Sequence, residues 1–84
     1  MTPRCEITVT YLRCTACGAM GGIVLDGQPI TPAMQQAAEH VRTRHPGQSV
    51  PDSLKLVTDC ARPPADAELT TWAAEYNARV NLGM

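Results

Sequence analysis

The chain has 84 residues, a length that predicts one domain over residues 1–84. Apolar residues make up 44% of it, yet there is no Phe, one Trp and two Tyr, so the large side chains that fill a core are scarce. A net charge of −1 gives no overall electrostatic reason to expect nucleic acid or an anionic membrane as a partner. A chain of this kind is expected to need a further stabilising element such as a metal ion.

Residues 1–20 contain no basic start followed by an apolar run, and no stretch approaches the roughly 18 apolar residues that span a bilayer. We therefore expect a cytoplasmic protein with no membrane partner. Four cysteines in such a chain are expected to be reduced thiols or metal ligands rather than a disulfide framework. Lys55 is the only lysine, and the preference for arginine is typical of high-GC coding, which suggests a bacterial or phage source.

The first predicted element is a strand over residues 6–13, where side chains alternate and β-branched types are frequent. The apolar run 23–25 predicts a second strand that folds back on the first as a hairpin. A C-x2-C motif then places Cys14 and Cys17 at the hairpin tip. The face of the first strand that we expect to be buried carries Ile7, Val9 and Tyr11.

A turn and a helix are predicted next. Asp26 and Gly27 predict a turn, and Pro29 limits residues 28–30 to a short extended or edge piece. Thr31 is expected to cap the helix and Pro32 to occupy its first position. The helix should cover residues 32–44. Its apolar stripe consists of Met34, Ala37, Ala38 and Val41.

Two further elements are predicted in the C-terminal part. Residues 54–58 read as a third strand, residues 62–64 as a break, and residues 65–79 as an amphipathic helix. The apolar stripe of that helix consists of Leu69, Trp72, Ala73, Tyr76 and Val80. We expect Trp72 and Tyr76 to lie in the core; if exposed, they would instead anchor a binding partner.

The cysteine pair is followed, after twenty-two residues, by an H-x4-H pair, His40 and His45. Two cysteines and two histidines are the ligands that zinc takes in tetrahedral sites. On an ideal helix His40 and His45 would point about 140° apart, so the last helical turn must loosen for both to reach one ion. Pro46 gives a reason for that loosening and places His45 at or just past the last turn.

Residues 6–47 resemble the C2H2 zinc finger family, in which paired cysteines at a hairpin precede a helix with paired histidines near its end. The resemblance implies that Cys14, Cys17, His40 and His45 hold a structural zinc ion. It also implies a small core, formed by Val9, Tyr11, Ile23, Leu25, Met34, Ala37 and Val41.

The departures from the family are equally clear. The spacer of twenty-two residues exceeds the usual 12 to 15, and neither a tandem repeat nor a finger-type linker is present. Residues 48–84 have no counterpart in the family. The expected fold is therefore α+β, a zinc-stabilised ββα unit over residues 6–47 extended by a C-terminal strand and amphipathic helix over residues 48–84.

Other roles for the cysteines stay open at this point. Cys14 and Cys17 could form a thioredoxin-like redox pair, although such a pair needs its first cysteine at a helix N-terminus, and glycine-rich, strand-like sequence follows here. Cys5 and Cys60 are expected to be small buried side chains. Either could instead replace a histidine as ligand, or form a disulfide in an exported chain.

The expected function is non-enzymatic. Four protein ligands leave a zinc ion no open position for water or substrate, and no enzyme motif is present. We expect a regulatory module that recognises a protein partner, with no small-molecule substrate. The alternative is DNA binding through the exposed side of the first helix, which carries Gln35, Gln36, Glu39, Arg42 and Thr43.

Overall fold

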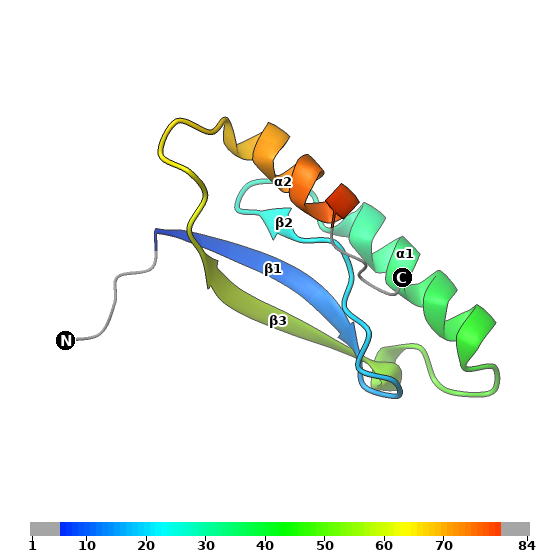
Figure 1. Ribbon diagram of the computed structural model, residues 1–84. Coiled ribbons are helices and arrows are strands. Elements are labelled where there is room, and N and C mark those ends of the chain that lie inside the picture. The colour runs from blue at the N-terminus through cyan, green and yellow to red at the C-terminus, as the bar shows by residue number, and fades with distance from the viewer. Residues whose placement is uncertain (1–5, 80–84) are drawn as a thin grey trace.

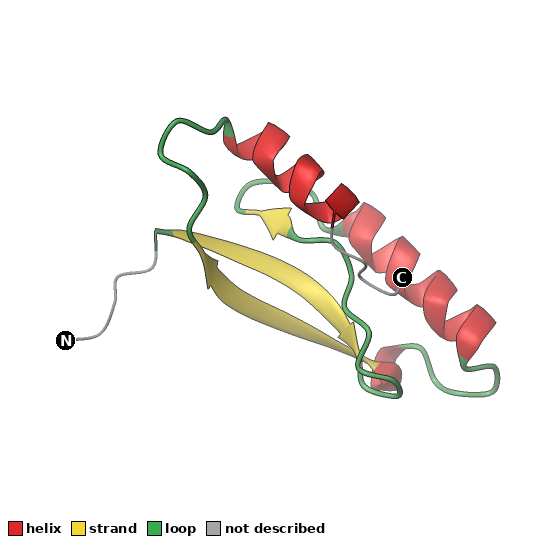
Figure 2. Cartoon of the chain, viewed as in Figure 1, coloured by secondary structure: helices red, strands yellow, loops and turns green. Residues whose placement is uncertain are grey.

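The computed structural model describes residues 6–79 and has an α+β fold, one three-stranded antiparallel sheet with two helices (Figure 1, Figure 2). The predicted fold class is confirmed. In chain order the elements are β1 (Ile7–Cys14), β2 (Val24–Leu25), α1 (Thr31–Arg44), a short 3-10 turn η1 (Pro51–Ser53), β3 (Leu54–Ala61) and α2 (Leu69–Arg79). Neither described helix combines the length and the apolar character needed to cross a bilayer.

The sheet has the order β2-β1-β3, with β1 in the centre. The predicted hairpin of β1 and β2 forms, but the two strands pair at only two positions, Val9 with Leu25 and Thr10 with Val24. The main partner of β1 is β3, which pairs with the whole of β1, from Ile7 opposite Ala61 to Cys14 opposite Leu54. This pairing extends β3 three residues beyond the predicted end, because partner contacts override the weak strand preference of Asp-Cys-Ala.

Residues 28 and 30 form bends, and Ile30 has a helical backbone conformation, so the extended or edge piece predicted over residues 28–30 is wrong. The backbone N–H of Gln28 donates to the Leu25 carbonyl at 3.0 Å, and the Gln28 side-chain oxygen accepts from the Leu25 N–H at 3.0 Å. These two bonds form a tight turn directly after β2. Gly27 has φ +86°, a conformation that glycine adopts without strain, as the Asp-Gly turn signal requires.

Both faces of β1 are used. Val9, Ile23 and Ala73 are buried together on the face that α2 covers. The partly buried residues packed around them are Ile7, Tyr11, Leu25, Ala61, Trp72 and Tyr76. This confirms the predicted buried face of the first strand and the core position of Trp72 and Tyr76, while Val80 lies outside the described residues. Because side chains alternate along a strand, Leu12 and Cys14, which are also buried, lie on the opposite face.

A side-chain amide fastens α2 to the segment that leads into β2. Asn77 Oδ1 accepts from the Ile23 N–H at 3.0 Å, and Asn77 Nδ2 donates to the Ile23 carbonyl at 3.3 Å. A Cβ placed on Gly22 would lie 3.2 Å from Asn77 Nδ2, so a larger residue there would crowd this bond. The C-terminal helix is therefore held by two directional bonds in addition to its apolar stripe.

The first helix departs from the prediction in two respects. The N-cap residue is Ile30, which makes no side-chain capping bond, so Thr31 is the first helical residue rather than the cap, and Pro32 is the second helical residue rather than the first. Ala37 and Val41 are fully buried, but Met34 is 51% exposed and not part of the core. Met34 and Val41 lie on nearly the same side of an ideal helix, about 10 Å apart along its axis. The rest of the chain therefore covers this side of α1 near Val41 but not near Met34.

The second helix begins at Leu69, four residues later than predicted. The cause is Glu68, whose carboxylate accepts hydrogen bonds from the N–H groups of Thr70 and Thr71, at 3.1 and 2.8 Å, and from the Thr71 hydroxyl at 2.7 Å. These N–H groups have no partner within the helix, so the carboxylate acts as its N-cap. The bonds lower the pKa of Glu68 from 4.5 to about 2, the Thr71 hydroxyl contributing most.

Acid is expected to loosen the start of α2 through Glu68. Because the pKa is lower in the folded state, the stabilising effect is complete above pH 4.5 and is lost as the pH falls towards 2. In Glu68→Gln this part of the acid response should disappear, which Trp72 fluorescence and circular dichroism would measure between these two values. Glu75→Gln, at an exposed position within α2, is the matched control and should keep the wild-type response. A Glu68→Gln profile identical to wild type would contradict the capping role.

Candidate metal centre

The cysteine pair lies in a tight turn at the end of β1. Cys14 is the last residue of that strand and is fully buried, whereas Cys17 is exposed. The Gly18 N–H donates to the Cys14 carbonyl at 2.7 Å, and the Cys14 N–H donates to the Ala19 carbonyl at 2.7 Å. Gly18 has φ +79°, which lets the chain reverse directly after the second cysteine. The predicted position of both cysteines at the hairpin tip is confirmed.

A contact from the C-terminal part supports this turn. The Thr15 N–H donates to the Ser53 carbonyl at 2.8 Å, and the Thr15 hydroxyl lies 3.4 Å from the Asp52 carbonyl. Ser53 itself is buried. The 3-10 turn η1 thus holds the cysteine turn from the side of β3. No sequence signal pointed to this support, because the partners are nearly forty positions apart and the connector before β3 is simply polar.

The two histidines lie at the C-terminal end of α1. His40 is on its last full turn and is buried, with 8% of its surface exposed. His45 is the C-cap residue, with φ −132° and ψ 59°, and its N–H donates to the Val41 carbonyl at 2.8 Å. Leaving the helical conformation at this residue brings the two rings to a centroid distance of 5.3 Å. The predicted position of His45, just past the last helical turn before Pro46, is confirmed.

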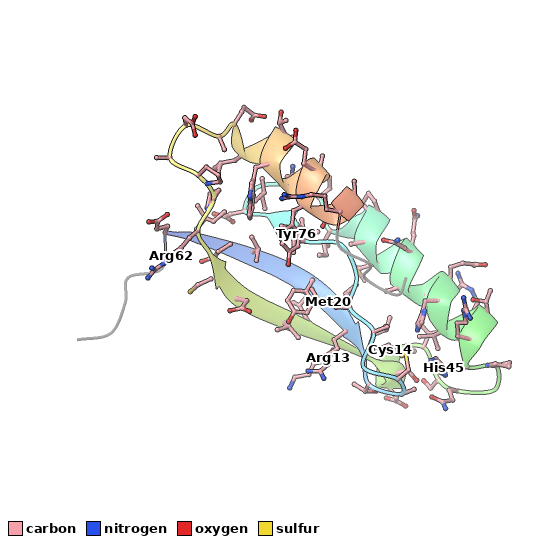
Figure 3. The ribbon with its side chains drawn as sticks, viewed as in Figure 1. Arg13, Cys14, Met20, His45, Arg62 and Tyr76 are labelled. Carbon is pink, nitrogen blue, oxygen red and sulfur yellow. The ribbon has the colours of Figure 1, made fainter. Side chains whose placement is uncertain are left out.

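All four predicted residues come together at one end of the molecule. One ligand atom from each of Cys14, Cys17, His40 and His45 lies within 4.8 Å of all the others, and Cys17 Sγ is 3.4 Å from His40 Nε2. Figure 3 shows Cys14 and His45 at the same end, where β1 finishes beside the end of α1. Tetrahedral coordination at roughly 2.0 to 2.3 Å separates ligand atoms by about 3.3 to 3.8 Å. A small contraction of the cluster would therefore bring the four ligand atoms to the separations of a tetrahedral metal site.

Two further observations fit a metal ion. Nε2 of His45 is buried without a hydrogen-bond partner in the described chain. A buried polar atom of this kind is costly unless something coordinates it. Burial acts to raise the pKa of the Cys14 thiol, but hydrogen bonds from the backbone N–H groups of Cys17 and Ala16, and from the Cys17 side chain, bring the pKa below its usual value. A lowered pKa favours the thiolate, which is the form of cysteine that binds a metal ion.

Cys60 does not belong to this cluster. Cys60 is exposed on β3, opposite Thr8 of β1, and it is disulfide-bonded, so the prediction of a small buried side chain is wrong for it. The reason is that Cys60 shares a face of the sheet with the exposed Thr8, whereas its neighbour Ala61 packs on the face that α2 covers. Cys5 lies outside the described residues. The expectation that the cysteines are reduced thiols or metal ligands is therefore wrong for Cys60, and the disulfide left open for an exported chain is present at this residue.

The redox interpretation of the cysteine pair finds no support in the local fold. Cys14 ends a strand, and residues 15–17 form a turn rather than the first turn of a helix. A thioredoxin-like pair requires the helix N-terminus to favour its thiolate. The geometry instead joins the pair to two histidines, which is an arrangement for binding a metal ion.

Comparison with known proteins does not identify a family for this chain. No family model, no curated protein and no solved structure matches the chain. The resemblance to C2H2 zinc fingers therefore depends on the four clustered residues and on the order of β1, β2 and α1. What this part of the chain has is a Cys2His2 cluster able to hold a metal ion.

Proposed function

We propose that the chain is a non-enzymatic regulatory module, stabilised by a structural zinc ion, that recognises a protein partner. The observation that supports it is the convergence of Cys14, Cys17, His40 and His45 on one point. These residues come from two elements, the end of β1 and the end of α1, so an ion bound to them would tie the sheet to the helix.

Zinc is the metal that this donor set favours. Two thiolates and two imidazoles suit a tetrahedral zinc ion, whereas calcium and magnesium take oxygen ligands. Four protein ligands would fill the coordination shell and leave no position for a reacting water or substrate. The role of the ion is then to stabilise the fold, and recognition is left to the surface around it.

The exposed side of α1 favours a protein over nucleic acid. Arg42 is the one cation among the five residues proposed above to meet DNA, and it forms an ion pair with Glu39 at 3.5 Å. A paired arginine is less available for phosphate, and phosphate contacts provide most of the affinity for nucleic acid. Met34 is 51% exposed on the same helix, and methionine is enriched at protein interfaces.

The metal is tested by elemental analysis, with one zinc ion expected per chain. The partner class is tested by fluorescence anisotropy with mixed-sequence DNA and RNA at low and high salt, and no salt-dependent binding is expected. Binding that weakens with salt and is reduced in Arg42→Ala would instead support the DNA-binding alternative, because phosphate contacts release counterions. A chain without stoichiometric zinc would refute the structural-zinc proposal whatever its partner.

A further inference from the structure

The strand β3 forms an outer edge of the sheet along its whole length of eight residues (Figure 1). No described element pairs with its outer side. Such an edge offers backbone donors and acceptors to another strand, and proteins usually protect it with prolines, bulges or charges. Here the prolines lie only outside the strand, at Pro51 before it and at residues 63–64 after it. The charges within the strand are Lys55 and Asp59.

The hydrogen bonds of β1 determine which residues of β3 face outwards. The Gly21 N–H donates to the Leu12 carbonyl at 2.8 Å, so even-numbered residues of β1 present their backbone to the β2 side. Because the direction alternates along a strand, the odd-numbered residues face β3. In the register between β1 and β3, odd-numbered residues lie opposite odd-numbered residues, for example Tyr11 opposite Val57. The N–H and C=O groups of Leu56 and Thr58 therefore point away from the sheet.

A second copy of the chain could pair with this edge in an antiparallel arrangement, and two-fold symmetry limits the register. In such a pair, a residue whose backbone N–H and C=O point away from its own sheet must lie opposite a residue of the same kind in the other copy. In β3 these are the even-numbered residues, so the two-fold axis can pass beside residue 56, 57 or 58. An axis at Val57 places Lys55 of each copy opposite Asp59 of the other. An axis at residue 56 places Lys55 opposite Val57, and one at residue 58 places it opposite Ala61. Opposite charges therefore meet in the Val57-centred register alone among these three.

We propose that the protein forms a homodimer through antiparallel β3–β3 pairing centred on Val57, which joins the two sheets into one of six strands. Two cross-strand ion pairs between Lys55 and Asp59 would select the register. Within one chain Lys55 lies opposite Arg13 of β1, and like charges in that position are unfavourable. Asp59 of the second copy would lie on the other side of Lys55 and offset this repulsion.

Apolar area supports the same arrangement. Leu56 is 59% exposed, the largest exposed fraction among the large apolar side chains of the described chain. In the Val57-centred register the two Leu56 side chains lie diagonally across the new strand pair, within reach of each other. Asp59 at present accepts a hydrogen bond from the Cys60 N–H at 2.8 Å. On dimerisation its carboxylate would exchange this local bond for the lysine of the second copy.

Sedimentation velocity of the full chain over a concentration series tests the proposal. A monomer–dimer equilibrium is expected for wild type. Lys55→Glu should raise the dissociation constant by roughly tenfold or more, because both ion pairs become repulsive. Its fold should persist, since the new carboxylate faces Arg13. The exchanged double variant Lys55→Asp with Asp59→Lys should recover most of the affinity.

Thr58→Pro provides an independent test. The Thr58 N–H points outwards, so proline removes a donor from the edge without breaking a bond to β1, and the variant should be monomeric with an unchanged circular dichroism spectrum. A wild type that stays monomeric up to about 1 mM would refute the dimer. A dimer that Lys55→Glu does not weaken, or that the double variant does not restore, would refute the charge-selected register. None of these outcomes depends on whether the cluster binds zinc.

Discussion

Cys14→Ser is expected to abolish stoichiometric zinc binding and to unfold the chain in the way that a chelator does. Cys14 is the fully buried member of the cluster, and its strand ends there. The binding free energy of structural zinc in small domains is about 10–16 kcal/mol. The folding stability of a typical domain is about 5–15 kcal/mol. Losing the ion should therefore remove most or all of the stability of a chain with so few large side chains.

The measurement combines metal content with circular dichroism before and after a chelator. Ala16→Ser is the matched control, because it adds the same hydroxyl at an exposed position of the same turn without touching a ligand. The control should keep both zinc and fold. Should Cys14→Ser and His40→Ala both retain one zinc ion and the native spectrum, the four residues would not be the ligands.

Val41→Ala is expected to destabilise the protein by about 2 kcal/mol and to weaken zinc binding. Val41 is fully buried and is among the largest side chains with no exposed surface in the described chain. It follows His40 in α1, and its carbonyl accepts the hydrogen bond that positions His45. A cavity at this point would let the end of the helix shift, and both histidines with it.

Chemical denaturation of the zinc-bound protein would measure the loss. Met34→Ala serves as the control, since it shortens a larger side chain two turns earlier on the same helix, at a site that is 51% exposed. Its effect should stay within about 0.5 kcal/mol, as for ordinary surface substitutions. Equal losses in the two variants would contradict the difference in burial between them.

The local elements of this chain could be predicted closely because their signals lie in neighbouring residues. The alternation in β1 and the Asp-Gly turn were read correctly. So was the end of α1 before Pro46, because a proline restricts the residue ahead of it. The start of α2 was missed, since it depends on the side chain of Glu68 rather than on the preceding prolines. The length of β3 was missed because it is decided by pairing with β1.

For the candidate metal centre, the sequence by itself predicted that Cys14, Cys17, His40 and His45 lie together, because their spacing reflects ligand chemistry and local turns, but it left Cys5 and Cys60 open as replacements for a histidine. Only the tertiary structure decided what surrounds them. The buried His45 Nε2 and the support of the cysteine turn by Ser53 arise from residues distant in the chain. The position of β3 at the sheet edge is likewise tertiary, since strand order depends on long-range pairing and not on local preference.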